Sequence, residues 1–238
     1  MTATDRFVRR RWHARLQRLR PYLLGAAAVL LVAVGTWVVL ETSALGARTV
    51  DVRGVSTVAP AVVRAEAGVV EGTPLARLDL DAIEEQVATI AQVESVDVRR
   101  QWPRTVVVEV VERTPVARLG GSDEVRLIDA EGVVYPPAGK PPRRLPEVVL
   151  ASGSGPRAAA LGEVADAVGA MDADLARRVR VVKVTSRDGI TLELRDGADV
   201  AWGSAEQAEL KAEVLAALLQ RKASAYDVSV PERPTIRP

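Results

Sequence analysis

The chain has 238 residues, a net charge of +1 and no cysteine. Near-neutral charge argues against a general nucleic-acid binder, which needs a broad basic surface. Without cysteine there are no disulfides, no thiolate nucleophile and no cysteine-ligated zinc, and His13 is the single imidazole. The length allows one large domain or two small ones, each with its own core.

An uncharged apolar stretch, Pro21 to Leu40, is about as long as a helix that spans a bilayer. Tyr22 and Trp37 lie toward its two ends, where interfacial aromatic side chains are typical. The preceding segment, residues 1–20, is rich in arginine and has Asp5 as its only acid. Because cytoplasmic flanks carry the excess of positive charge, the sequence predicts a cytoplasmic tail (1–20), a transmembrane helix (21–40) and an extracytoplasmic remainder.

Other interpretations of the apolar stretch are open. A cleaved signal peptide is the main alternative, because Ala44-Leu45-Gly46 has small residues at cleavage-like spacing. The apolar run is longer than the roughly 7–15 residues usual in a signal peptide, which favours an uncleaved anchor. A buried globular helix is less favoured, since no polar face interrupts the run. The expected topology is single-pass type II in the cell membrane.

Residues 48–117 predict a small domain in the order strand, helix, helix, strand, strand. A half-buried first strand is indicated by Val50 and Val52, which alternate with polar residues. A helix follows, for which Ser56 or Thr57 is the expected N-cap.

A second helix and a hairpin complete this pattern. Asp81 and Glu84 have the spacing of a capping box at the start of the second helix. Residues 99–117, RRQWPRTVVVEVVERTPVA, stop sharply at Trp102-Pro103 and resume with a run dominated by valine. Since proline lacks an N–H and disfavours a helix interior, this pair predicts the turn between two antiparallel strands, with Trp102 packed at the corner. The expected inward face of the second strand consists of Val106, Val108 and Val110.

This order, with the motifs on it, resembles the POTRA domain of the FtsQ/DivIB family of bacterial cell division proteins. The most specific part of the resemblance is the run from Arg100 through Trp102-Pro103 to Glu112-Arg113 and Pro115-Val116-Ala117. POTRA order also occurs in secretion and membrane-assembly components, which is the alternative function. The second domain also resembles the division family, and it favours division over that alternative.

Residues 118–230 predict this second, mixed β domain with flanking helices, so that the fold class is α+β. Asp129 and Gly132 stand where the family has an Asp-x-x-Gly hairpin. One helix is expected over residues 155–178 and another after Ser204, its expected N-cap, with strands between them. The expected inward face of the last helix consists of Leu210, Val214, Ala217 and Leu218. Trp202-Gly203 and Lys211 also stand at positions that match the family.

The carboxyl terminus, a last strand followed by a tail over residues 231–238, is expected to hold the partner-binding site. Pro231 and Pro234 cannot donate to a ladder, which restricts this region to a sheet edge or an extension beyond it. An edge leaves backbone groups available to a partner strand, here along Tyr226–Val230. The resemblance places the contact with FtsB/DivIC in this region, and the expected contact residues are Tyr226, Val228, Val230, Glu232, Arg233 and Ile236.

The resemblance implies a non-enzymatic bitopic scaffold of the divisome, from a high-GC Gram-positive bacterium and enriched at the division septum. Such a scaffold binds FtsB/DivIC and FtsL and helps to control septal peptidoglycan synthesis. Catalysis has no support in the residues, because His13 is expected across the membrane from the folded domains and cannot join a Ser-His-Asp triad there. No Ser-x-x-Lys pair of the penicillin-binding type occurs. No cofactor, metal, nucleic acid or small-molecule substrate is expected.

Overall fold

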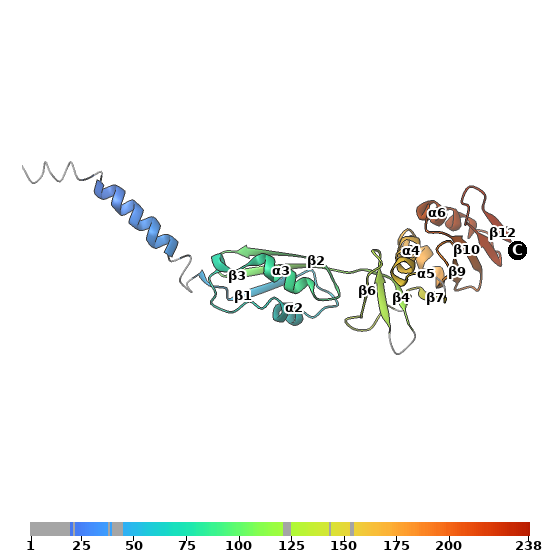
Figure 1. Ribbon diagram of the computed structural model, residues 1–238, viewed down its shortest axis with the longest axis horizontal. Helices are drawn as coiled ribbons and strands as arrows, with labels where there is room; N and C mark the ends of the chain where they lie inside the picture. Colours follow the sequence, from blue (N-terminus) through green and yellow to red (C-terminus); the bar gives the residue numbers. More distant parts are fainter. Residues whose placement is uncertain are drawn as a thin grey trace, which may run out of the picture. The chain divides into compact units, whose positions relative to one another are not determined.

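The computed structural model describes residues 20, 22–37, 39, 45–120, 125–142, 144–152 and 155–238. The chain divides into two compact units, and each carries its own sheet (Figure 1). The first unit comprises residues 1–53, 60–87 and 96–109. The second unit comprises residues 54–59, 88–95 and 110–238.

The apolar stretch is helical at its described positions, which include residues 22–37. Its large apolar side chains are exposed, from 49% for Val34 to 76% for Tyr22. Across the residues that the structure describes, none of the helices has the length and apolar character needed to cross a membrane. Residues 1–19, including His13, lie outside the described part of the chain.

A three-stranded sheet with two helices forms the predicted strand, helix, helix, strand, strand order. Its strands are β1 (Thr49–Arg53), β2 (Val93–Gln101) and β3 (Thr105–Glu112), in the order β1-β3-β2. Its helices are α2 (Pro60–Glu66), the 3-10 turn η2 (Leu75–Arg77) and α3 (Leu80–Ala88). Strand β1 runs parallel to β3, so that the two strands begin at the same end of the sheet.

The valines of β3 form the centre of this core. Val106, Val108 and Val110 are at most 2% exposed, which confirms the predicted inward face. Val107 is also fully buried, although it points to the opposite face. Its burial follows from the position of β3 as the central strand between β1 and β2.

The predicted capping box of α3 is wrong. Asp79, rather than Asp81, caps this helix, since its Oδ1 accepts a hydrogen bond from the Ala82 amide at 3.2 Å. Glu84 instead reaches β2, where its Oε1 accepts from the Val98 amide at 2.8 Å. Strand β2 lies at an edge of the sheet, so this carboxylate satisfies a backbone donor that has no partner strand.

Trp102-Pro103 lies in the turn between β2 and β3, as predicted. The side chain of Trp102 is 50% exposed, however, so the expectation of a packed corner is wrong. Just before this turn, Arg100 of β2 fastens η2 to the sheet, since its Nε donates to the Leu75 carbonyl at 2.6 Å.

The second unit is built on a nine-stranded sheet with helices against it. Its strands are β4 (Pro115–Leu119), β5 (Arg126–Asp129), β6 (Val134–Tyr135), β7 (Glu147–Leu150), β8 (Val179–Val184), β9 (Ile190–Leu194), β10 (Asp199–Gly203), β11 (Ala225–Asp227) and β12 (Thr235–Arg237). The order is β12-β11-β10-β9-β8-β7-β4-β5-β6, so β12 and β6 are the edges. The helices are α4 (Arg157–Gly169), α5 (Ala173–Arg178) and α6 (Ala208–Leu218).

One face of this sheet is buried and the other is charged. The buried cluster includes Leu161 and Val164 of α4 together with Trp202 of β10. The opposite face carries cross-strand ion pairs, such as Arg118 with Glu147 at 2.7 Å between Nη2 and Oε2. The alternation of buried and exposed residues along β8 and β9 is the pattern of a sheet with one solvated face.

The single helix predicted for residues 155–178 is two helices. Helix α4 ends at Gly169, and Asp172 starts α5 by accepting a hydrogen bond from the Leu175 amide at 2.7 Å. An N-cap carboxylate inside an apolar periodic stretch is therefore the signal that marks the break.

The predicted start of α6 is also wrong, and its predicted inward face is right only for Val214 and Leu218, which pack against the core. Ser204 is not its N-cap, because the helix begins after Gln207, which has a left-handed backbone with φ of 56°. Lys211 and its neighbours Ala212 and Leu215 form the buried face, whereas Leu210 is 40% exposed. The apolar pattern shifts this face because one of its buried residues is a lysine.

We expect Val108→Asp to unfold the first unit, because it places an unpaired carboxylate in a fully buried position. The matched control is Val111→Asp, the same change on the same strand at a position that is 50% exposed. Thermal unfolding followed by circular dichroism measures both variants. Similar melting of the two variants would contradict the assignment of the inward face.

Candidate functional site

The predicted contact residues fall into a buried pair and an exposed group. Tyr226 and Val228 are 4% and 0% exposed, so they belong to the core rather than to a contact surface. The Tyr226 hydroxyl donates to the Arg221 carbonyl at 2.8 Å and accepts from the Ala223 amide at 3.1 Å, which closes the loop between α6 and β11.

The chain itself covers the strand edge that was expected to be free. Strand β12 pairs antiparallel with β11, with Tyr226 opposite Ile236 and Asp227 opposite Thr235. The expectation of an open edge along Tyr226–Val230 is therefore wrong, because the chain turns back after Val230. The turn is closed by the Arg233 amide, which donates to the Val230 carbonyl at 2.9 Å.

The outer side of β12 is the unpaired edge at this end of the sheet. The Val228 amide, just after β11, donates to the Ala201 carbonyl of β10. The backbone N–H and C=O groups of even-numbered residues in and next to β11 therefore point toward β10. The odd-numbered residues of β11 consequently face Thr235 and Arg237 of β12. Because backbone groups of successive residues point to opposite sides of a strand, the N–H and C=O of Ile236 point outward.

Prolines limit what this edge offers to a partner. Pro234 and Pro238 are the residues on either side of Ile236 with the same outward orientation, and neither has an N–H. Over residues 234–238, the Ile236 amide is therefore the single outward backbone donor.

The remaining predicted residues surround this edge on the surface. Val230 is 53% exposed and Ile236 is 37% exposed. Glu232 and Arg233 are exposed in the turn, and Glu232 Oε1 accepts from Gln207 Nε2 at 3.3 Å. The structure thus brings Val230, Glu232, Arg233 and Ile236 to one end of the sheet.

Gly203 and the buried Lys211 shape the segment that precedes α6, next to the chain that leads into the turn over residues 230–233. Gly203 has a φ of +82°, and a Cβ at this position would lie 3.0 Å from the Ser229 Cβ. Lys211 is 2% exposed, and its Nζ donates to the Ser204 carbonyl at 2.9 Å. Burial lowers the pKa of Lys211, an effect that the negative charge of Glu206 partly opposes.

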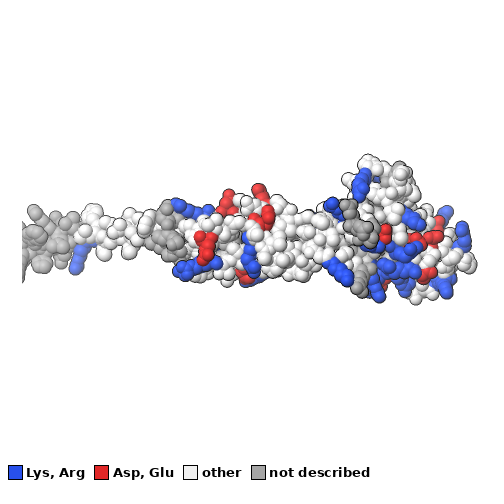
Figure 2. Space-filling view, turned by 90° about the horizontal axis from the view of Figure 1, so that it is seen from below, with Lys and Arg blue, Asp and Glu red and all other residues white. Residues whose placement is uncertain are grey.

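A groove of about 580 Å³ runs along the charged face beside this edge. Its lining includes Asp199, Asp227, Lys183 and Arg237, so it presents charges of both signs. Figure 2 shows lysine and arginine side chains interspersed with acidic ones on the second unit. Ile236 of β12 also lines this groove, so the groove and the β12 edge adjoin each other.

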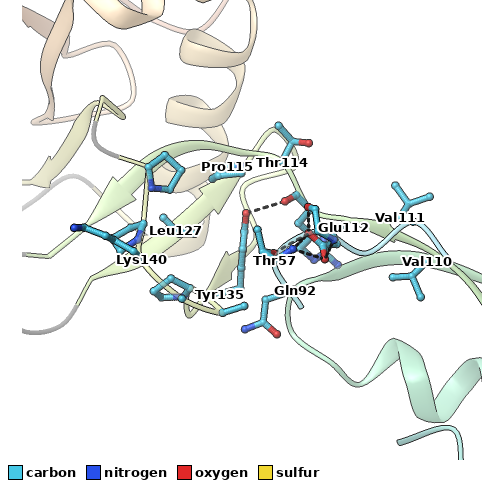
Figure 3. Close-up of a pocket in the computed structure, with 18 residues that line it drawn as sticks. Thr57, Gln92, Val110, Val111, Glu112, Thr114, Pro115, Leu127, Tyr135 and Lys140 are labelled. Atoms are coloured by element: carbon cyan, nitrogen blue, oxygen red, sulfur yellow. Dashed lines mark hydrogen bonds between the residues drawn. The ribbon is translucent and has the colours of Figure 1, made fainter. Parts of the chain in front are cut away.

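The second unit also contains a cavity of about 610 Å³ around Glu112 (Figure 3). The Glu112 carboxylate accepts hydrogen bonds from the amides of Ser56, Thr57 and Val58, at 2.8 to 3.1 Å. The hydroxyls of Ser56 and Thr57 also donate to this carboxylate. The prediction that one of these two residues caps α2 is therefore wrong. Burial raises the pKa of Glu112, but the hydrogen bonds outweigh it and lower the pKa to about 2. Glu112 is thus an ionised structural group.

The next residue, Arg113, fastens a second segment of the same unit. Its Nη1 lies 2.7 Å from Oδ2 of Asp129, which is 1% exposed. Asp129 Oδ1 also accepts from the Val133 amide at 2.7 Å, which forms the predicted turn at Gly132. The Tyr135 hydroxyl donates to the Arg113 carbonyl at 3.2 Å, and burial raises the pKa of Tyr135 to about 12. Among the residues that the structure describes, no group of three or more His, Cys, Asp or Glu residues is arranged to hold a metal ion.

These features define a class of protein: a POTRA domain followed by a mixed β domain whose last strand forms an unpaired edge of the sheet. Residues 45–113 match the family described as POTRA domain, FtsQ-type, and residues 117–230 match the family described as Cell division protein FtsQ/DivIB, C-terminal. The chain belongs to the FtsQ/DivIB family of cell division proteins.

Relatives from high-GC Gram-positive bacteria support this assignment along most of the chain. The Cell division protein FtsQ of Streptomyces venezuelae is 37% identical, over 92% of this chain and 84% of the relative. The Cell division protein FtsQ of Mycolicibacterium smegmatis is also 37% identical, over 90% of this chain and 64% of the relative. These matches favour the predicted role in division over the alternative role in secretion.

We expect Glu112→Gln to destabilise the protein at pH 7, by less than the roughly 3 kcal/mol that a lowering of the pKa from 4.5 to about 2 corresponds to, because solvent screens this carboxylate. Because the folded-state pKa is lowered, this contribution is complete above about pH 4.5 and disappears as the pH falls toward 2. Urea unfolding of wild type and variant between pH 2 and pH 7 measures it. Glu213→Gln, at an exposed position, is the control. A difference in stability that stays constant with pH would refute the role of the ionised carboxylate.

Proposed function

We propose that this chain is a single-pass membrane scaffold of the divisome that binds FtsB/DivIC at the β12 edge. The observation that carries the proposal is the outward backbone of Ile236 at an otherwise proline-limited edge. A partner segment that adds as a strand there gains backbone hydrogen bonds from Ile236 and side-chain contacts on both faces of the sheet.

Membrane anchoring is supported by the amino-terminal helix. Its apolar side chains, such as Leu30 and Leu31, are 64% and 73% exposed, and an apolar surface of this kind requires cover from lipid or from another chain. The arginine-rich segment 1–20 then lies in the cytoplasm, and the rest of the chain lies outside.

Side-chain chemistry around the edge favours an acidic, partly apolar partner segment. The Ile236 side chain lies opposite Tyr226, on the face of the sheet that the core covers. Arg233 and Arg237 add two positive charges beside it, against one negative charge on Glu232. An antiparallel or parallel partner strand with an apolar residue opposite Ile236 and carboxylates next to it fits this arrangement.

The wider role follows from the family and from the partner. FtsB/DivIC together with FtsL forms the complex that we propose this scaffold to bind, and through it the chain helps to control septal peptidoglycan synthesis. Catalysis takes no part in this proposal, because binding at an exposed strand edge requires no reacting group.

The partner edge is tested by Ile236→Pro in the full chain. This change removes the single outward donor, and it leaves the bonds between β12 and β11 in place because the Ile236 amide points away from β11. We expect capture of the extracytoplasmic segment of FtsB/DivIC to weaken about tenfold, as the loss of one such bond and of its packing implies.

Ile236→Ala is the matched control, because it retains the donor and shortens the side chain. It should weaken capture less than Ile236→Pro. Deletion of residues 231–238 is less informative, since it removes β12 and uncovers the edge of β11. Equal capture by wild type and by a folded Ile236→Pro variant would place the contact elsewhere.

Topology is tested with reporter cysteines, which the natural chain lacks. Ser186→Cys lies at an exposed turn of the second unit and Thr4→Cys lies in the arginine-rich tail. We expect a membrane-impermeant maleimide to label Ser186→Cys in whole cells and Thr4→Cys only after lysis. The reverse pattern would refute the orientation, and mature protein that lacks its first residues would support the cleaved signal peptide.

A further inference from the structure

Separate segments of the first unit meet where the chain enters β1. The Ala47 amide donates to the Thr73 carbonyl and the Gly72 amide donates to the Ala47 carbonyl, both at 2.8 Å. The Arg48 amide donates to the Arg104 carbonyl, also at 2.8 Å. The loop over residues 70–73 and the turn over residues 102–104 therefore flank the residues that directly precede β1.

This end of the unit exposes large apolar side chains together with arginine. Trp102 is 50% exposed and Val70 is 70% exposed. Arg48 is also exposed, and Arg104 lies in the same turn as Trp102. Glu71 is the acid of the 70–73 loop, so the charged groups at this end are mainly positive.

The covalent chain keeps this end close to the apolar helix. Ala47 follows Leu40, the last residue of the apolar stretch, by seven positions, which span at most about 25 Å. The headgroup layer on each side of a bilayer is roughly 5–7 Å thick. A chain anchored through residues 21–40 thus carries Trp102 and Val70 within reach of the lipid headgroups.

We propose that the end formed by Val70, Trp102 and Arg48 lies in the headgroup layer of the membrane and contacts anionic lipid. The inference rests on the proposed membrane anchoring. Indole rings prefer the interface between hydrocarbon and water, because they combine an apolar surface with one N–H donor. Arginine beside them is attracted by the negative surface potential of anionic lipid. This contact explains why a tryptophan at a hairpin turn is half exposed instead of packed.

The full chain in lipid nanodiscs that contain phosphatidylglycerol provides the test. Gln101→Cys, at the exposed end of β2, carries an environment-sensitive fluorophore, and some lipids carry a nitroxide on the headgroup. Asp97→Cys is the control position, since four residues along a strand place it about 13 Å further away. We expect quenching by the nitroxide to be at least about twofold stronger at position 101 than at position 97, as an interfacial tryptophan implies.

A second set of variants assigns the contact to the side chains. Trp102→Ser should reduce the quenching at position 101, whereas Val62→Ser, at an apolar position on α2 that is also 50% exposed, should leave it unchanged. Trp102→Tyr should retain most of it, because tyrosine is also an interfacial side chain.

The outcomes separate this inference from the membrane anchor. Equal quenching at positions 101 and 97, in a chain that stays in the nanodisc, would overturn the headgroup contact and leave the anchor intact. The same result is expected if a protein partner, and not lipid, covers Trp102. A chain that is not retained by the nanodisc would overturn both.

Discussion

An open sheet leaves unpaired backbone N–H and C=O groups along its edges, and these groups must find water, a side chain or another chain. Strand β2 meets this constraint with Glu84, whose carboxylate accepts from the Val98 amide. Strand β6 meets it by being only two residues long. Strand β12 meets it with prolines on either side of Ile236, which leave a single outward donor. At the β12 edge, the Ile236 N–H and C=O are the backbone groups that we propose a partner strand to bind.

Two consecutive residues fasten separate segments to the end of β3. Neighbouring residues in extended chain point to opposite sides, so Glu112 and Arg113 can bind different partners at one place. Glu112 collects the amides of residues 56–58, and Arg113 pairs with the buried Asp129. The hydrogen bonds to Glu112 outweigh its burial, which is why a carboxylate suits this position better than an amide would. The Glu-Arg pair of the family motif thus has a structural reason that its sequence alone does not reveal.

Alternation along strands and proline or glycine turns in the sequence predict the structure well, whereas helix boundaries and capping signals do not. The alternation of Val106, Val108 and Val110 predicts a buried strand because many contacts depend on that register. Capping signals at Asp81 and Ser204 mislead, since several polar residues near a helix start have suitable spacing and packing decides among them. Strand β12 has three residues after a proline, too few to show a period. The sequence therefore leads us to expect a free edge on β11, whereas β12 is the strand at this edge of the sheet.

The edge that offers Ile236 is linked to a buried lysine through a short chain of hydrogen bonds. Lys211 reaches the Ser204 carbonyl from inside the unit, and this bond fixes the loop that leads to Gln207. Gln207 in turn donates to Glu232, in the turn that brings the chain back into β12. Burying an ammonium group is unfavourable, as the lowered pKa of Lys211 reflects, so its value lies in fixing one loop geometry rather than in added stability. The contact surface that we propose at the carboxyl terminus consequently depends on α6, a helix with a lysine among its buried residues.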